Sequence, residues 1–345
     1  MHSYEAEVLP GLEPFARREI AGRFRKDARV APTGPEGEVR FTYSGAERQL
    51  LALRTVVSVY RVLDFDVPRP KALLGHEHLS RLLTEIDEVL SLQGRRAFKT
   101  FRFSAAGSDT VVFDRLRDAV GEHTRLAVNP EEADFLLRVR PTPAGEGWQV
   151  LLRLTPRPLA TRPWRLCDWP GALNATIAAV MVELSDPRAK DRVLNPMCGS
   201  GTLLIERLAR RPAALAYGAD TDQEALYCAQ ENIIAAGMAR MIQLAQMDAT
   251  ALDVPDGSFD VLFADLPWGQ LSGSHRENEW LYPAALAEWG RVAAPGARLV
   301  AITHEIALMD DVLPTVDHLW ELSEQLTVYQ GGLHPSIYLF ERKDS

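Results

Sequence analysis

The chain has 345 residues, 46% of them hydrophobic and 25% charged, which is typical of a globular protein of two or three domains and excludes a disordered chain. Its net charge of −9 argues against a nucleic-acid partner for the molecule as a whole. The charge is uneven, however: residues 1–165 hold 26 Lys and Arg against 22 Asp and Glu, and the remainder holds 12 against 25, so a polyanion stays compatible with the N-terminal half.

Strand and helix patterns alternate over the first 158 residues. Strand patterns at 4–9 and 38–43, with helical patterns at 14–24 and 46–63, predict a small α+β domain over residues 1–68. A second α+β domain is expected over residues 69–158. Its helices are expected near 72–93 and 110–124, and its strands near 98–105, 133–142 and 147–156.

The C-terminal half has a different pattern. Residues 159–170 are rich in Pro, Arg and Trp and are interpreted as a linker. From residue 171 to 345, short apolar strands alternate with helices, which indicates βαβ units and a parallel sheet. Segments 326–332 and 336–343 are typical of an antiparallel hairpin that closes this sheet. The expected fold class is therefore α/β.

A glycine-rich turn follows the first strand of this half. In NPMCGSGT, Gly199 and Gly201 stand between a strand and a helix, where backbone N–H groups are free to meet a ligand. Asp220 ends the next strand, where a carboxylate can bind both hydroxyls of a ribose. Asp248 follows the third strand and is a candidate acceptor for an adenine amine. Asp222 stands beside a helix start and is interpreted as a cap.

The turn lacks the third glycine of a dinucleotide fingerprint and the lysine of a triphosphate loop, because Thr202 and Leu203 follow Gly201. We therefore expect a nucleoside without a phosphate chain, and S-adenosyl-L-methionine is such a ligand. Asn174, at the start of a helix, either caps that helix or contacts the methionine part of this cofactor.

A second motif, DLPWG, follows a later apolar strand. Asp265 and the backbone carbonyl of Leu266 can accept the two hydrogens of a planar amine and turn its lone pair toward a methyl donor. Trp268 can stack on the base, Pro267 stiffens the loop, and Asp265 is the nearest acceptor for the released proton. Without the glycine turn, this stretch would be interpreted as an ordinary strand end.

Taken together, NPMCGSGT, GADTDQEAL, MDAT and DLPWG resemble the successive motifs of Rossmann-fold S-adenosylmethionine-dependent methyltransferases. NPMCGSGT and VYQGGLHPSIYLF are most similar to the THUMP-domain tRNA guanine-N2 methyltransferases. Two positions depart from that pattern: Asn195 stands where the family usually has Asp, and Leu266 where it usually has Pro.

The resemblance implies a ferredoxin-like domain over residues 1–68, a THUMP RNA-binding domain over 69–158 and a Rossmann-fold methyltransferase domain over 171–345. It also implies S-adenosyl-L-methionine as cofactor, tRNA as partner and N2-methylguanosine in the acceptor stem as product. Catalytic contacts would come from Asp265, Leu266, Pro267 and Trp268. Cofactor contacts would come from Asn174, Asn195, Pro196, Cys198, Gly199, Gly201, Thr202, Asp220 and Asp248.

Two basic stretches are candidates for RNA contact, and each is equally well a solvated surface. They comprise Arg95, Arg96, Lys99 and Arg102 in the first half, and Arg162, Trp164 and Arg165 in the expected linker. Cys198 is interpreted as structural rather than as a nucleophile for pyrimidine C5 chemistry.

We expect no metal, disulfide framework, membrane partner or obligate protein partner. The three cysteines form no CxxC pair, no apolar run reaches roughly 18 residues, and the first residues show no secretory leader, so a cytoplasmic protein is expected. The competing interpretations are another planar amine (rRNA guanine N2, adenine N6 or a protein glutamine amide) and a non-catalytic RNA-binding protein.

Overall fold

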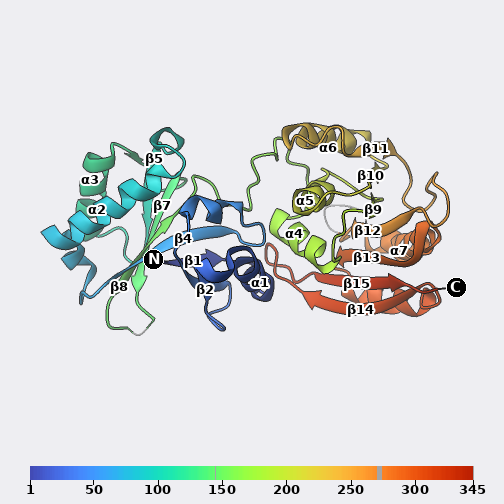
Figure 1. Ribbon diagram of the computed structural model, residues 1–345, viewed down its shortest axis with the longest axis horizontal. Helices are drawn as coiled ribbons and strands as arrows, with labels where there is room; N and C mark the ends of the chain where they lie inside the picture. Colours follow the sequence, from blue (N-terminus) through green and yellow to red (C-terminus); the bar gives the residue numbers. More distant parts are fainter. Residues whose placement is uncertain (144, 270–273, 345) are drawn as a thin grey trace. The chain divides into compact units, whose positions relative to one another are not determined.

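The computed structural model describes residues 1–143, 145–269 and 274–344, and it divides the chain into two compact units, each built on its own sheet (Figure 1). The first unit comprises Met1–Val8 and Glu13–Ala160, and the second comprises Leu9–Leu12 and Thr161–Ser345. The mixed α/β class expected from the sequence is confirmed.

The first unit is an eight-stranded sheet with strand order β2-β3-β1-β4-β8-β7-β5-β6. Its strands are β1 (His2–Glu7), β2 (Ala28–Val30), β3 (Glu38–Tyr43), β4 (Ser58–Phe65), β5 (Thr100–Ser104), β6 (Ala127–Val128), β7 (Phe135–Pro141) and β8 (Trp148–Arg153). Its α-helices are α1 (Glu13–Phe24), α2 (His76–Ser91) and α3 (Val111–Thr124). Short 3-10 turns occupy Arg25–Asp27, Glu47–Ala52, Pro70–Leu74 and Arg95–Ala97.

The prediction of a helix over residues 46–63 is wrong. A 3-10 turn covers only Glu47–Ala52, and residues 58–65 form β4, which pairs with β1 on one side and with β8 on the other. Because six of its eight residues are buried, β4 lacks the alternation of apolar and polar residues that identifies a half-exposed strand. The β4–β8 pairing also joins all eight strands of residues 1–153 in one sheet. The expected domain boundary at residue 68 falls within that sheet, and it stays a prediction.

The second unit is a seven-stranded sheet with strand order β11-β10-β9-β12-β13-β15-β14. Its strands are β9 (Arg192–Asn195), β10 (Leu215–Asp220), β11 (Gln243–Gln246), β12 (Phe259–Asp265), β13 (Ala293–Thr303), β14 (Trp320–Thr327) and β15 (Ser336–Arg342). Its helices are α4 (Ala175–Leu184), α5 (Thr202–Arg210), α6 (Gln223–Ala235), α7 (His275–Val292) and α8 (Ile306–Val312), with a 3-10 turn at Leu313–Thr315.

Strands β9 to β13 are parallel, whereas β15 runs antiparallel to both β13 and β14. The expected parallel sheet is therefore confirmed. An antiparallel hairpin does close it, but its first strand is Trp320–Thr327 rather than the expected 326–332. In this strand order β9 lies between β10 and β12, so the ends of all three strands meet at one edge of the sheet. Ligands of open parallel sheets bind at that edge, where the chain reverses its direction of winding.

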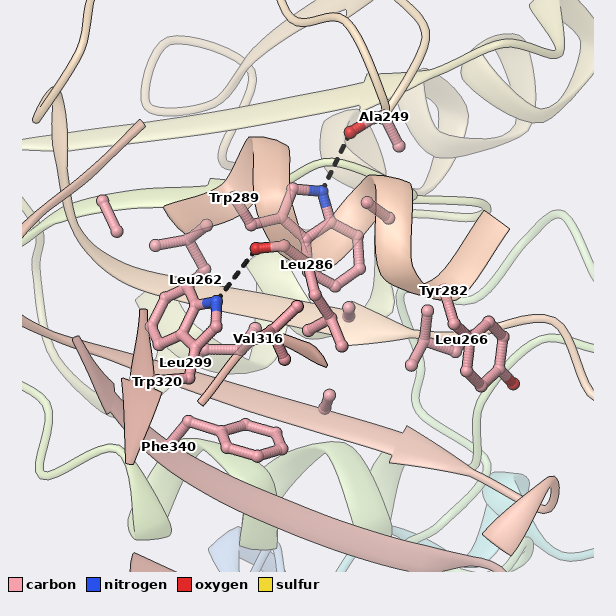
Figure 2. Packing of buried hydrophobic residues seen from close by; sticks show 14 of the residues in the cluster. Ala249, Leu262, Leu266, Tyr282, Leu286, Trp289, Leu299, Val316, Trp320 and Phe340 are labelled. Carbon is pink, nitrogen blue, oxygen red and sulfur yellow. Dashed lines mark hydrogen bonds between the residues drawn. The ribbon is translucent and has the colours of Figure 1, made fainter. Parts of the chain in front are cut away.

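The core of the second unit anchors DLPWG (Figure 2). Two buried tryptophans fix the helices on the sheet: Trp289 donates to the Ala249 carbonyl at 3.0 Å, and Trp320 donates to the Leu286 carbonyl at 2.9 Å. The side chain of Leu266 belongs to this apolar cluster and is 1% exposed. Position 266 is therefore an apolar anchor, and what it offers to a ligand is its backbone.

Candidate active site

A cavity of about 1240 Å³ lies at the edge where β9, β10 and β12 end. It combines the glycine loop, the acidic residues after three strands, the DLPWG motif, part of α7 and the segment 168–173. The lining that the structure describes contains no Lys or Arg, but it contains six acids: Asp168, Asp220, Asp222, Asp248, Asp265 and Glu277. Such a lining disfavours a phosphate chain and suits a cationic ligand that carries hydroxyl and amine donors.

The two glycines of the loop have different tasks. Gly199 has a φ of +48°, and a Cβ there would meet nothing within 4 Å, so its backbone is open toward the cavity that it lines. Gly201, with a φ of +79°, caps α5, and a Cβ there would lie 3.4 Å from the Ala229 side chain of α6. Gly201 is not among the cavity residues, so it serves the turn and the packing of α5 on α6.

Asp220 is tied to the glycine loop. Its two carboxylate oxygens accept the Gly199 N–H at 2.8 Å and the Asp222 N–H at 3.0 Å. Asp222 accepts the N–H groups of Glu224 and Ala225 and caps α6, as its position beside the helix start suggested. Asp248 also lines the cavity, where it is exposed and accepts the Thr250 N–H at 2.8 Å.

The remaining loop residues are largely buried. Asn195 accepts the Met197 N–H at 3.2 Å, and Pro196, Cys198 and Thr202 line the cavity beside it. Burial raises the pKa of the Cys198 thiol far above its usual range, which supports a structural role for this side chain. Thus the loop supplies shape and backbone groups rather than a nucleophile.

Asn174 is placed as a helix cap. Its side chain accepts the Thr176 N–H at 2.8 Å and the Thr176 hydroxyl at 2.7 Å at the start of α4. Its neighbour Leu173 lines the cavity, but Asn174 is not one of the described residues that line it. Of the two interpretations open from the sequence, this geometry favours the cap.

The DLPWG motif enters the cavity directly from β12. The Leu266 N–H donates to the Ile302 carbonyl of β13 at 3.0 Å, which continues the sheet and fixes the loop's entry. The Trp268 indole N–H donates to an Asp265 carboxylate oxygen at 3.2 Å. Burial raises the pKa of Asp265 to about 7, an effect that the Trp268 hydrogen bond partly opposes. A carboxylate with a pKa near neutrality is suited to accept a proton from an amine.

Residues 161–170 belong to the second unit and are not a linker, and the three side chains proposed for RNA contact are engaged within that unit. Arg162 is buried and forms an ion pair with Glu206 of α5 at 2.9 Å. Trp164 is only 8% exposed, too little for stacking on a base. Arg165 donates to the Leu173 carbonyl at 2.7 Å and to the Thr202 hydroxyl at 3.0 Å. Both arginines thus bind residues of α5, the helix after the glycine loop, and composition alone does not indicate these contacts.

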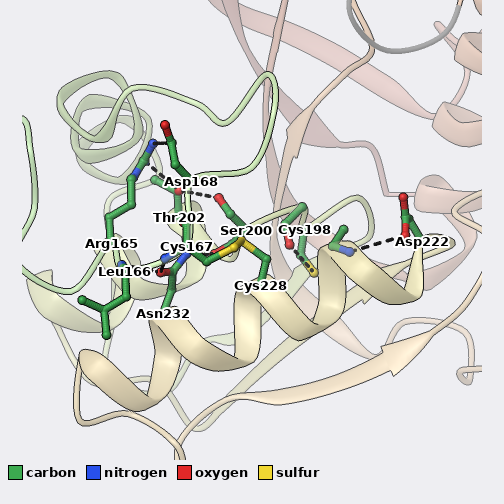
Figure 3. The surroundings of a disulfide bond; sticks show 12 residues. Arg165, Leu166, Cys167, Asp168, Cys198, Ser200, Thr202, Asp222, Cys228 and Asn232 are labelled. Carbon is green, nitrogen blue, oxygen red and sulfur yellow. Dashed lines mark hydrogen bonds and ion pairs between the residues drawn. A yellow bond between two sulfur atoms is a disulfide. The ribbon is translucent and has the colours of Figure 1, made fainter.

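A disulfide joins Cys167 to Cys228 of α6, contrary to the expectation of no disulfide (Figure 3). Buried Asn232, one turn further along α6, accepts the N–H groups of Leu166 and Cys167 and donates to the carbonyls of Cys167 and Ser200. One covalent bond and three hydrogen bonds therefore fix the start of segment 168–173, which forms a wall of the cavity, and the fourth hydrogen bond ties Asn232 to the glycine loop. The two cysteines are 61 residues apart in sequence, so spacing gave no signal.

The other basic stretch lies in the first unit. Arg96 follows α2 in a 3-10 turn, Lys99 is exposed, and Arg102 of β5 is half-buried. The Arg95 side chain lies outside the described part of the structure. Nothing in the geometry tests RNA contact here, so this part of the hypothesis stays a prediction.

Sequence reasoning missed the contribution of α7. This helix begins at His275 and brings Glu277, Asn278, Trp280 and Leu281 to the cavity. A Ser-x-x-Glu pattern at Ser274 and Glu277 was the available signal: the Ser274 hydroxyl accepts the Glu277 N–H at 3.3 Å, as in a capping box, and donates to the Glu277 carboxylate at 2.9 Å.

Residues 1–143, 145–269 and 274–344 bear on two further classes of site, metal sites and membrane spans. Within these ranges, no three His, Cys, Asp or Glu side chains are grouped to hold a metal ion. None of the helices in the same ranges has the length and apolarity required to cross a membrane.

Comparison with known proteins agrees with this site. Residues 162–335 match the model of the UPF0020 family, described as RMKL-like, methyltransferase domain. The tRNA (guanine(6)-N(2))-methyltransferase THUMP3 of Bos taurus is 32% identical over 185 residues, which are 50% of this chain and 37% of that protein. The chain thus spans a little over a third of the length of this relative.

A curated relative and two solved structures match over nearly the whole chain. The tRNA (guanine(6)-N2)-methyltransferase of Thermus thermophilus is 26% identical, covering 98% of this chain and 99% of its own. The crystal structure of TrmN from Thermus thermophilus has a TM-score of 0.76 at 25% identity, covering 99% of this chain and 100% of that one. SMU.472, solved in complex with SAH, shares the fold with a TM-score of 0.71 at 14% identity.

Proposed function

The chain belongs to the UPF0020 family of RMKL-like methyltransferase domains, and we propose that it transfers a methyl group from S-adenosyl-L-methionine to the N2 amine of a guanine in tRNA. The observation that carries this function is the juxtaposition, in one cavity, of an open glycine loop, an acid after β10 and DLPWG after β12. The Thermus thermophilus relative that matches nearly the whole chain is named for this activity, which supports guanine over adenine and RNA over protein.

The cavity fits the cofactor on its own evidence. Gly199 leaves its backbone open to a ligand, and Asp220 and Asp248 would hold the ribose and adenine donors. Because the described lining has six acids and no Lys or Arg, it favours a sulfonium cation over a nucleotide phosphate. When bound, S-adenosyl-L-methionine supplies a methyl group that the amine nitrogen can attack.

The residues of DLPWG orient the amine. Asp265 would accept one N–H and the Leu266 carbonyl the other, which directs the nitrogen lone pair at the methyl carbon. Transfer would break the bond between the methyl carbon and the donor sulfur, which would keep the electron pair as a neutral thioether. The nitrogen would become cationic, and its proton would pass to the Asp265 carboxylate, whose pKa of about 7 suits that transfer. Trp268 keeps its indole N–H on Asp265, so its ring offers only its faces for stacking.

A paired guanine has to leave its helix to reach Asp265, at a cost of a few kcal/mol. We place the target in the acceptor stem and the RNA grip in the N-terminal half, which would act as ferredoxin-like and THUMP domains. The uneven charge along the chain and the basic residues at 96, 99 and 102 support this assignment. A tRNA-modifying role also supports a cytoplasmic location.

Replacing guanosine by inosine tests the target atom, because inosine lacks only the N2 amine. A tRNA transcript with guanosine throughout its acceptor stem is expected to accept the methyl group, and the same transcript with inosine at those positions is not. Equal acceptance by both transcripts would move the target out of the acceptor stem or off guanine N2. Calorimetric titration with S-adenosylhomocysteine distinguishes an enzyme, which binds this ligand, from an RNA-binding protein that no longer binds the cofactor.

A further inference from the structure

The Pro267 carbonyl of DLPWG receives two hydrogen bonds from α7. The Asn278 side-chain amide donates to it at 2.8 Å, and the Tyr282 hydroxyl donates at 2.7 Å. Both side chains are completely buried. They stand four residues apart, which places them on the same face of the helix. A carbonyl oxygen has two lone pairs, so these two donors leave the Pro267 carbonyl with no free lone pair for another donor.

The Tyr282 hydroxyl is itself held in place. Its oxygen lies 2.6 Å from the Thr303 hydroxyl at the end of β13, and the Thr303 oxygen accepts the Glu305 N–H at 2.9 Å. Because a carbonyl can only accept, the Tyr282 proton points to Pro267, and Thr303 therefore donates to Tyr282. A directed chain of hydrogen bonds thus runs from β13 to the loop. Figure 2 shows the Tyr282 ring beside Leu266, with its hydroxyl pointing out of the apolar cluster.

Asn278 holds this position at a cost to stability. Its side-chain oxygen is buried and has no hydrogen-bond partner in the described structure. An unpaired buried acceptor destabilises the folded state, and an apolar side chain of similar volume would avoid that penalty. What the asparagine supplies in return is the N–H that holds Pro267, next to the residues that meet the amine.

We propose that Asn278 and Tyr282 are positioning residues for methyl transfer. By saturating the Pro267 carbonyl they fix the orientation of the adjoining peptide groups, so that only Asp265 and the Leu266 carbonyl face the two amine hydrogens. We call Asn278 and Tyr282 together the Pro267 clamp. Its role rests on the proposed function of the cavity, because the clamp matters for transfer only while an amine is held there.

The test compares Tyr282→Phe and Asn278→Ala with the native chain in single-turnover transfer of labelled methyl to tRNA. Tyr282→Phe keeps the ring and removes one donor, so it is expected to fold even where Asn278→Ala does not. The transfer rate constant is expected to fall roughly tenfold in Tyr282→Phe, the factor for one hydrogen bond used in orientation. The dissociation constant of S-adenosylhomocysteine is expected to stay within about twofold.

Tyr338→Phe is the matched control, since it removes the hydroxyl of another fully buried tyrosine whose oxygen has no hydrogen-bond partner in the described structure. Its transfer rate is expected to equal that of the native chain. An unchanged rate in Tyr282→Phe, or the same loss in Tyr338→Phe, overturns the proposal. The native chain's labelled product tests the proposed function separately, because the ratio of variant to native rates is measured on whichever RNA the native chain labels.

Discussion

Replacing Asp265 by Asn is expected to stabilise the protein while it removes the activity. The cavity raises the pKa of Asp265 from 3.8 to about 7, because burial disfavours the charged carboxylate. The folded chain therefore binds this proton more tightly than the unfolded chain does. Stability is then lost as the pH rises from about 4 to about 7, and the full loss is present above pH 7. Asn is neutral at every pH and escapes this penalty.

The size of the effect follows from the same pKa difference. A change from 3.8 to about 7 corresponds to roughly 4 kcal/mol, and we discount this to about 2 kcal/mol because water reaches part of the side chain. The asparagine of this variant would keep an oxygen acceptor for the Trp268 indole N–H. The hydrogen bond is therefore kept, and its loss does not reduce the expected gain in stability. In a unit of this size, about 2 kcal/mol raises the melting temperature by roughly 4–8 °C.

Calorimetric melting of the native chain and Asp265→Asn at pH 4.5 and pH 8 measures this effect. We expect a higher melting temperature for the variant at pH 8, a clearly smaller gap at pH 4.5, and a loss of methyl transfer of about 100-fold or more. Asp222→Asn is the control, because Asn replaces Asp as a helix cap in an exposed place, and little change is expected. A gap of equal size at both pH values, or a less stable variant at pH 8, would refute the reasoning.

Three more outcomes follow from the cavity and its wall. Cys167→Ser opens a loop of about 61 residues, so it should lower the free energy of unfolding by up to about 4 kcal/mol and weaken the binding of S-adenosylhomocysteine. The native chain treated with a dithiol should behave like this variant. Unchanged binding would contradict the role of the disulfide in the cavity wall. Arg162→Ala leaves Glu206 buried without this partner and should cost about 3–5 kcal/mol in urea unfolding, whereas an effect on tRNA affinity alone would restore the RNA-contact hypothesis. Asp220→Asn should weaken S-adenosylhomocysteine roughly tenfold in calorimetry with little change in melting temperature, because Asn keeps one acceptor for the loop; unaltered affinity would remove Asp220 from the cofactor site.

The glycine turn and DLPWG could be recognised from the sequence, since each depends on residues adjacent in sequence. Their meeting in one cavity followed from the parallel order of the strands, because the carboxyl ends of β9 and β12 must lie at the same edge. The sequence could not separate the tasks of Gly199 and Gly201, however. That difference depends on whether open space or Ala229 of α6 faces each missing Cβ.

Other features depend on contacts between distant residues and left no local pattern. The β4 strand is paired on both sides and largely buried, so its run of apolar residues resembled a buried helix. Arg162 carried the signature of a surface cation, but Glu206, 44 residues away, makes it an interior one. The Pro267 clamp acts through a backbone carbonyl, a group that every residue possesses and that no side-chain pattern reveals.

The most direct test of the central claim is the transfer of labelled methyl from S-adenosyl-L-methionine to total tRNA, followed by nucleoside analysis, with Asp265→Ala in parallel. The account predicts label in N2-methylguanosine for the native chain and none for the variant. Label in N6-methyladenosine would keep the amine chemistry and overturn the assignment of guanine. Label that persists in Asp265→Ala would contradict the role assigned to DLPWG itself.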